Sequence, residues 1–217
     1  MKISEAMSVA VEQLRAGRLE AAAEICRRVL EVQPDHLPAH ELAGAIAYRL
    51  GDYDGAAGHF RCALARDAEA ARHYGNLGMA LRAQGKSAEA IDTYEQGLRR
   101  APAMAELHNN LGNAWRDARD LARAVACFEE ALRLKGDYVE AHQNLGETLA
   151  AQGRREAAAA CWRRAIALKP DFVPALNSLG NLLRLEGRPA EALGAFQQAL
   201  GAEPDNADVH NNLGNAL

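Results

Sequence analysis

The chain repeats a 34-residue pattern along its whole length. The stretch "LHNNLGNAW" at residues 107–115 returns as "VHNNLGNAL" at 209–217, which starts 102 residues later, or three periods of 34. Counted from Ile3, the full repeats cover residues 3–36, 37–70, 71–104, 105–138, 139–172 and 173–206, and a partial repeat covers 207–217. Because a fixed period of this length is typical of stacked repeat architectures, we expect one solenoid domain spanning 1–217.

Each repeat has the pattern of two helices. Apolar or small residues fall at positions 4, 7, 8 and 11 of the repeat, which is the spacing of one helix face. Glycine at position 15 predicts the end of the first helix because it accepts a left-handed backbone, and Arg119 is the exception. A second helix is expected from about position 18 to about position 30, ahead of the proline that many repeats carry at position 32. The sequence therefore predicts an all-α fold of antiparallel helix pairs.

Small residues recur where the two helices of a pair should meet. Position 20 is alanine in all six full repeats, and position 8 is glycine in six of seven. Position 24 is aromatic in five repeats, so we expect a ring to fill the space that the small residues leave. The first repeat departs from the pattern, with Ala10, Gln13 and Cys26 at positions 8, 11 and 24. We interpret it as a divergent terminal repeat, as solenoids need at their ends.

These residues carry a family resemblance. The segments "YGNLGMAL…AIDTYEQGL…P" and "HNNLGNAW…AVACFEEAL" resemble the tetratricopeptide repeat, with its aromatic or histidine residue, Leu-Gly pair, Ala-x3-Phe and proline at a period of 34. The resemblance covers the whole chain. It implies a right-handed α-solenoid, or superhelix, in which the first helix of each repeat lines a concave groove.

Asparagine gathers on the face opposite the buried one. The chain has eleven asparagines, and ten lie on that face of the first helices. An asparagine inside a helix costs several tenths of a kcal/mol relative to alanine, so ten of them call for a reason. One interpretation is a ladder of carboxamides that grips an extended peptide, since each offers donors and an acceptor. The other is that asparagine at position 6 ties neighbouring repeats together. The predicted peptide-binding groove comprises Asn76, Arg82, Asn109, Asn110, Asn113, Arg116, Asn144, Asn177, Asn181, Arg184, Asn211, Asn212 and Asn215.

The charges of this face are mixed, because arginines sit beside Glu106, Glu140, Glu147, Asp117 and Asp208. Family members that clamp a C-terminal carboxylate place lysines at positions 2 and 5, and those lysines are absent here. A chaperone-tail adaptor is therefore disfavoured, although a single arginine could hold one acidic group.

The first two repeats carry apolar residues on the same face. We interpret this stripe as a surface for a partner or a second copy of the chain, with burial by the N-terminal end itself as the alternative. The residues of this predicted association surface are Met7, Val11, Leu14, Leu42 and Tyr48.

Composition narrows the classes of partner and the compartment that we expect for this chain. The net charge of −4 argues against nucleic acid as a partner. The sequence has no run of about 18 apolar residues, so membrane insertion is not predicted. The N-terminal segment has no secretory pattern and the cysteines form no CxxC pair, so we expect a cytoplasmic protein with reduced thiols. Histidine recurs at position 4, but equivalent positions should lie roughly 10 Å apart, too far to share a metal. No metal, cofactor or catalytic residue is predicted.

Together these patterns favour a non-catalytic scaffold that binds an extended or helical peptide segment of another protein. The phrase "NNLGNA" is also similar to the repeat arm of O-GlcNAc transferases and their SPINDLY-like bacterial relatives. That similarity implies the alternative of a substrate-recognition arm in a larger glycosyltransferase. A self-assembling scaffold, or homo-oligomer, is the third hypothesis. Because the chain stops at Leu217, inside a first helix, we expect a longer parent protein.

Overall fold

A computed structural model of the protein describes residues 2–216, and these residues form helices and no strands. The prediction of an all-α fold of helix pairs is therefore confirmed. The helices are α1 (Ile3–Arg15), α2 (Leu19–Val32), α3 (Leu37–Arg49), α4 (Tyr53–Arg66), α5 (Ala71–Ala83), α6 (Ser87–Arg100), α7 (Ala105–Asp117), α8 (Leu121–Leu134), α9 (Val139–Ala151), α10 (Arg155–Leu168), α11 (Val173–Leu185), α12 (Pro189–Ala202) and α13 (Ala207–Gly214). Every odd-numbered helix begins at position 1 of a repeat.

The first helix of each full repeat ends as the glycine pattern predicts. Five glycines at position 15 have left-handed φ angles between 72° and 81°. At Gly153 the backbone closes a Schellman motif, because Gly153 N–H donates to the Ala150 carbonyl and Arg154 N–H donates to the Leu149 carbonyl, both at 2.9 Å. Arg119 takes the same conformation with a φ of 66°, so the turn is kept without glycine.

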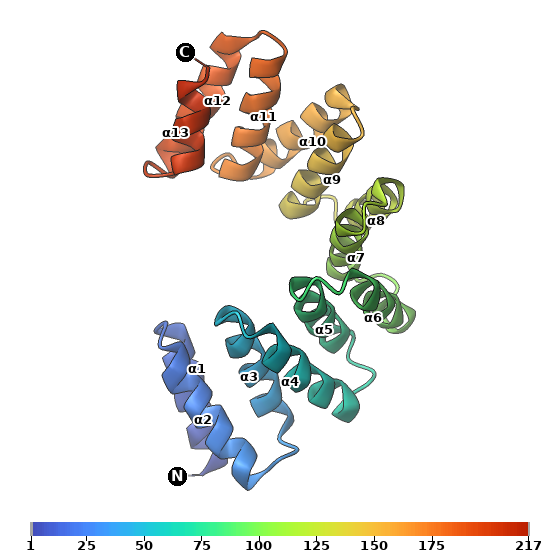
Figure 1. Ribbon diagram of the computed structural model, residues 1–217, viewed down its shortest axis with the longest axis vertical. Helices are drawn as coiled ribbons and strands as arrows, with labels where there is room; N and C mark the ends of the chain where they lie inside the picture. Colours follow the sequence, from blue (N-terminus) through green and yellow to red (C-terminus); the bar gives the residue numbers. More distant parts are fainter. Residues whose placement is uncertain (1, 217) are drawn as a thin grey trace. The chain divides into compact units, whose positions relative to one another are not determined.

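The helices form two compact units, Met1–Ala114 and Trp115–Leu217. In the first unit consecutive helices pack against one another from α1 through α6, and in the second unit they do so from α8 through α13 (Figure 1). First helices also contact one another, α1 with α3, α9 with α11 and α11 with α13. Within each unit, the first helices of neighbouring repeats therefore line one face, which we call the inner face.

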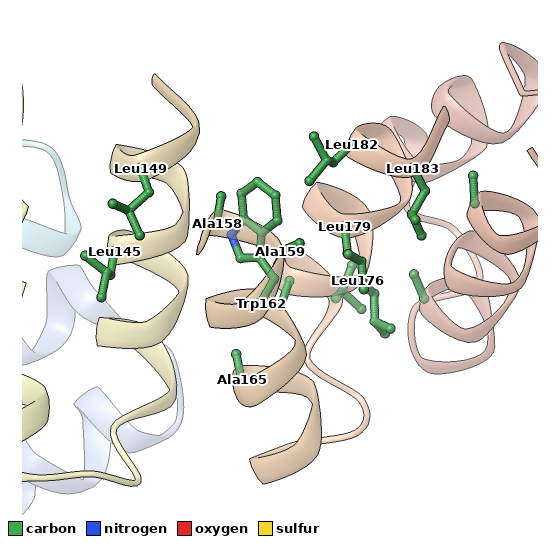
Figure 2. Packing of buried hydrophobic residues seen from close by; sticks show 14 of the residues in the cluster. Leu145, Leu149, Ala158, Ala159, Trp162, Ala165, Leu176, Leu179, Leu182 and Leu183 are labelled. Carbon is green, nitrogen blue, oxygen red and sulfur yellow. The ribbon is translucent and has the colours of Figure 1, made fainter. Parts of the chain in front are cut away.

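Close packing between paired helices explains the small residues. A Cβ atom added at Gly146 would lie 2.4 Å from Trp162 Nε1, and one at Gly180 would lie 2.6 Å from Phe196 Cε1. Figure 2 shows the Trp162 ring of α10 between the leucines of α9 and those of α11. The first unit repeats this geometry at Gly44 and Gly78, so the expected contact between position 8 and the ring at position 24 is confirmed.

The first repeat packs its two helices with different residues at positions 8 and 24. Ala10 and Cys26 are both fully buried in one cluster with Ala22 and Ile46. Because the thiol of Cys26 is smaller than an aromatic ring, it leaves room for the Cβ atom that Ala10 adds. Burial also raises the pKa of the Cys26 thiol to about 11. The two departures from the repeat are thus one complementary exchange.

In five repeats an aromatic residue at position 4 joins the first helix to the loop before it by a hydrogen bond. The Nε2 atoms of four histidines lie 2.7 to 3.1 Å from the carbonyl oxygen six residues earlier, and Tyr74 donates its hydroxyl to the Ala68 carbonyl at 3.1 Å. A carbonyl can only accept, so each of these Nε2 atoms carries the proton. The histidines are His40, His108, His142 and His210.

Candidate functional site

A polar groove lies on the inner face of the second unit. It has a volume of about 290 Å³ and is lined by residues of α9, α11, the α12–α13 loop and α13, including Gln143, Asn177 and Ser178. Three of its lining residues are carboxylates, Glu147, Glu203 and Asp208, and none of the lining residues that the structure describes is basic. The groove therefore favours a ligand that brings hydrogen-bond donors or positive charge.

Amide side chains in and beside this groove connect neighbouring repeats. Asn212 Nδ2 donates to Asn177 Oδ1 at 2.8 Å, and Gln143 Nε2 donates to Ser178 Oγ at 3.0 Å. Both bonds join position 5 of one repeat to position 6 of the next. A carboxamide has two N–H donors and an acceptor oxygen with two lone pairs, so each bond uses only part of the amide. The inter-repeat tie that the sequence left open is therefore present at Asn212.

The arginines of this face differ in their surroundings. Arg116 Nη1 lies 2.6 Å from Glu147 Oε2, so position 12 of one repeat pairs with position 9 of the next. At the equivalent place after Arg184 the repeat has Asn215 instead of a carboxylate. The Nε atom of Arg184 is buried, and within residues 2–216 no hydrogen-bond acceptor reaches it. An unsatisfied buried N–H of this kind is uncommon in folded proteins.

The predicted groove residues of the first unit differ in how far they are buried. Asn109 and Asn113 are only 5% and 8% exposed, so they offer little surface to a ligand. Asn76, Asn110 and Arg82 are half-buried. In the second unit two predicted residues are exposed, Asn211 and Asn215. The others are half-buried: Asn144, Asn177, Asn181, Asn212, Arg116 and Arg184.

The arginine at position 2 of the third repeat forms an ion pair, since Arg72 Nε lies 3.0 Å from Glu41 Oε1.

A second groove of about 630 Å³ runs between α1 and α3 on the inner face of the first unit. Three residues of the predicted association surface line it, Met7, Val11 and Leu42. Leu14 is half-buried against the cluster around Cys26 and does not line this groove. The ring of Tyr48 lies 5.4 Å from that of Tyr53, also outside the lining. The structure thus brings three of the five predicted residues together.

Two polar residues of the second unit were missed from the sequence. Gln143 and Ser178 occupy positions 5 and 6, the positions where asparagine was counted, and they join the same network. Counting every side chain with an amide or hydroxyl at these positions would have found them.

Comparison with known proteins places this geometry among repeat proteins. The tetratricopeptide repeat profile matches residues 10–71, 76–139, 144–207 and 177–217. No curated protein matches the chain. None of the helices within residues 2–216 is long and apolar enough to cross a lipid bilayer.

Solved structures share the fold. A chain of the APC/C hetero-tetramer Cut9–Hcn1 aligns with all of this chain, with a TM-score of 0.82 and 18% sequence identity. The alignment covers 43% of that larger chain. PilW, a type IV pilus biogenesis factor, has a TM-score of 0.85 at 18% identity, covering 97% of this chain and 98% of PilW. YrrB, a protein with an unusual peptide-binding site, has a TM-score of 0.60 at 20% identity over 87% of this chain and 97% of YrrB.

Proposed function

The chain belongs to the tetratricopeptide repeat family, and from this premise we propose that it is a non-catalytic scaffold for protein binding. A segment of a partner protein lies against the inner face of the first helices and is held there by amide and guanidinium groups. YrrB, which shares the fold, has a peptide-binding site, and the same kind of ligand suits the polar inner groove of this chain.

The buried Nε of Arg184 is the observation that carries this proposal. A buried donor without an acceptor costs about 1–3 kcal/mol. The Arg184 side chain as a whole is only half-buried, so a rotation of this side chain would bring Nε to a carbonyl or carboxylate oxygen of a bound peptide and recover that cost. Asn181 lies three residues before Arg184 on α11, so the two side chains share one helix face. Together they offer a peptide both a charged donor and an amide.

Amides recognise backbone rather than particular side chains. The unused donor and acceptor capacity of Asn177 and Asn212 can pair with the N–H and C=O groups of an extended segment of any sequence. The carboxylates of Glu147 and Asp208 add a preference for lysine or arginine in the segment. In the first unit, Asn76, Asn110 and Arg82 would hold peptide in the same way.

Peptide display followed by calorimetry tests the proposal. Peptides selected on the full chain should bind at least about tenfold more weakly to a variant with Asn177→Ala, Asn181→Ala and Arg184→Ala, because a hydrogen bond to a charged group contributes about 1.5–3 kcal/mol. A matched control removes two amides and one arginine from exposed positions of second helices, with Gln96→Ala, Gln197→Ala and Arg155→Ala. Equal affinity of the inner-face variant and the control would contradict the proposal.

A second candidate is self-association through the groove between α1 and α3, which its apolar lining favours. Sedimentation velocity over a concentration series should then show dimers that Val11→Asp converts to monomers. Leu185→Asp is the control because Leu185 is an exposed apolar residue of the second unit, at 66% exposure. A wild-type chain that stays monomeric at high concentration would exclude this candidate.

A further inference from the structure

A deep groove lies between α2 and α4, with α3 as its floor. Its volume is about 740 Å³, and Ala43, Ile46 and Ala47 line the floor while Leu30 and Leu50 line the sides. It shares no lining residue with the inner groove between α1 and α3, which takes Pro38, Glu41, Leu42 and Ala45 from α3. Helix α3 therefore separates two grooves of the first unit.

Two alanines account for the depth of this groove. Ala43 and Ala47 occupy positions 7 and 11, and from the third repeat onward these positions hold leucine or tryptophan. The equivalent groove of the second unit lies between α10 and α12 over α11, where Leu179 and Leu183 line the floor. Its volume is about 370 Å³, half that of the first. The second repeat thus leaves open the space that two large side chains fill elsewhere.

The rim of the groove is acidic. Four carboxylates line it, Glu20, Glu24, Glu31 and Asp52, together with one cation, Arg27. The lining therefore carries a formal charge of −3. Arg27 pairs with both Glu24 and Glu31, and its hydrogen bond lowers the pKa of Glu24. The equivalent groove of the second unit has one arginine and one glutamate, Arg163 and Glu191, and is neutral.

A histidine pair adds a hydrogen-bond acceptor to the groove. His40 donates from Nε2 to the Pro34 carbonyl at 2.9 Å, so the Nδ1 atom of the neutral ring is an acceptor. The Nδ1 atoms of His40 and His59 are 3.1 Å apart, which makes His59 Nδ1 the donor and leaves His59 Nε2 as an acceptor. Burial, and then the neighbouring His40, lower the pKa of His59, which favours this neutral state.

We propose that this groove docks a cationic amphipathic helix of a partner protein. Ala43 and Ala47 are one helical turn apart, so two leucine-sized side chains spaced by one turn on the partner would fill the space above them. Lysine or arginine beside those side chains would face the acidic rim, which complements their charge. Because the groove lies on the other side of α3 from the inner groove, this partner is additional to the peptide proposed above.

A designed helical peptide is the probe. It carries leucines at positions i and i+4 with lysines around them, and its counterpart carries glutamates in place of the lysines. Fluorescence anisotropy with the full chain should show binding of the cationic peptide only. Ala43→Leu with Ala47→Leu introduces the repeat's own residues and should weaken binding at least about tenfold without lowering the melting temperature. Ala122→Leu with Ala160→Leu, the same change at two exposed alanines on second helices of the second unit, should leave binding unchanged.

A charge variant tests the rim without changing the floor. Glu20→Gln with Glu31→Gln should weaken the cationic peptide and reduce the salt dependence of its binding. Glu95→Gln with Glu129→Gln is the control, because it makes the same charge change at exposed positions outside the groove. The proposal is overturned if the cationic peptide fails to bind, if the anionic peptide binds equally, or if the leucine variant keeps full affinity.

Discussion

The side-chain amide of Gln198 on α12 donates a hydrogen bond to the carbonyl oxygen of Pro170, with 2.8 Å between the two heavy atoms. In other repeats this carbonyl, at position 32, accepts from the aromatic side chain at position 4 of the next repeat. Here position 4 is Leu176, which is buried and has no donor. A residue of the second helix therefore replaces a hydrogen bond that the first helix provides elsewhere.

Gln198→Ala should lower the free energy of unfolding by about 0.5–1 kcal/mol, since the bond is exposed and water partly replaces the lost donor. Urea unfolding monitored by circular dichroism measures this. Gln197→Ala, next to it and exposed on the same helix, should change stability by only a few tenths of a kcal/mol. Equal losses in the two variants would show that the bond to Pro170 contributes nothing.

Gly146→Ala should destabilise the second unit. The new Cβ atom would lie 2.4 Å from Trp162 Nε1, and the ring is buried and rigid, so helices α9 and α10 must separate. Overpacking of this kind costs about 1–3 kcal/mol. Thermal unfolding gives the value, and Gly214→Ala is the control because no atom lies within 4 Å of its added Cβ.

Ala10 and Cys26 should be coupled. Cys26→Phe alone places a ring against the Cβ of Ala10 and should destabilise by about 1–3 kcal/mol. Adding Ala10→Gly recreates the arrangement seen at Gly44 and Phe60, so the double variant should recover most of that loss. A double-mutant cycle by chemical unfolding measures the coupling, and additive effects would disprove it.

Much of the fold follows from residues that act locally or within one repeat. Glycine at position 15 sets a left-handed turn by its own backbone freedom, and the helices accordingly begin at 34-residue intervals. The contact of Gly146 with Trp162 was predictable because both lie in the same helix pair.

The candidate sites were harder to predict because they depend on contacts between repeats. The helix wheel placed Asn109 and Asn113 on an open face, whereas neighbouring side chains bury both. The bond from Asn212 to Asn177 requires the register of two helices that the sequence pattern does not specify. In the sequence, the groove over Ala43 and Ala47 corresponds only to two small residues, which do not by themselves predict a groove. The alternative of a recognition arm in a larger glycosyltransferase stays a prediction.

Arg119→Gly should stabilise the second unit. Arg119 holds the left-handed conformation, with a φ of 66°, that glycine adopts at the other five turns. Relief of this strain is worth about 1 kcal/mol, and the greater freedom of glycine in the unfolded chain offsets part of it, so we expect a gain of about 0.5 kcal/mol. Gly153→Ala makes the reverse change at the equivalent turn and should lower the melting temperature.

His73 should make the chain less stable in mild acid. Its ring is fully buried, with Glu41 Oε1 3.5 Å from Nδ1 and Asp67 Oδ2 3.8 Å from Nε2. Burial, and then the charge of Arg72, lower the pKa of His73 below the ordinary 6.5, although Glu41 and Asp67 act in the opposite direction. The folded state therefore binds the proton less readily than the unfolded state does.

Since the unfolded chain takes up this proton first, the free energy of unfolding should fall as the pH drops below 6.5, and the loss should grow until the folded ring itself is protonated. His73→Ala places at position 3 the residue that Ala39, Ala141 and Ala175 provide in other repeats, and it should flatten the pH dependence. Urea midpoints between about pH 7 and about pH 5 measure the slope. Thr93→Ala removes a buried polar group that does not titrate, so it should change stability but keep the wild-type slope. A slope that His73→Ala leaves unchanged would assign the acid sensitivity to other groups, such as His59 and His142, whose pKa values burial also lowers.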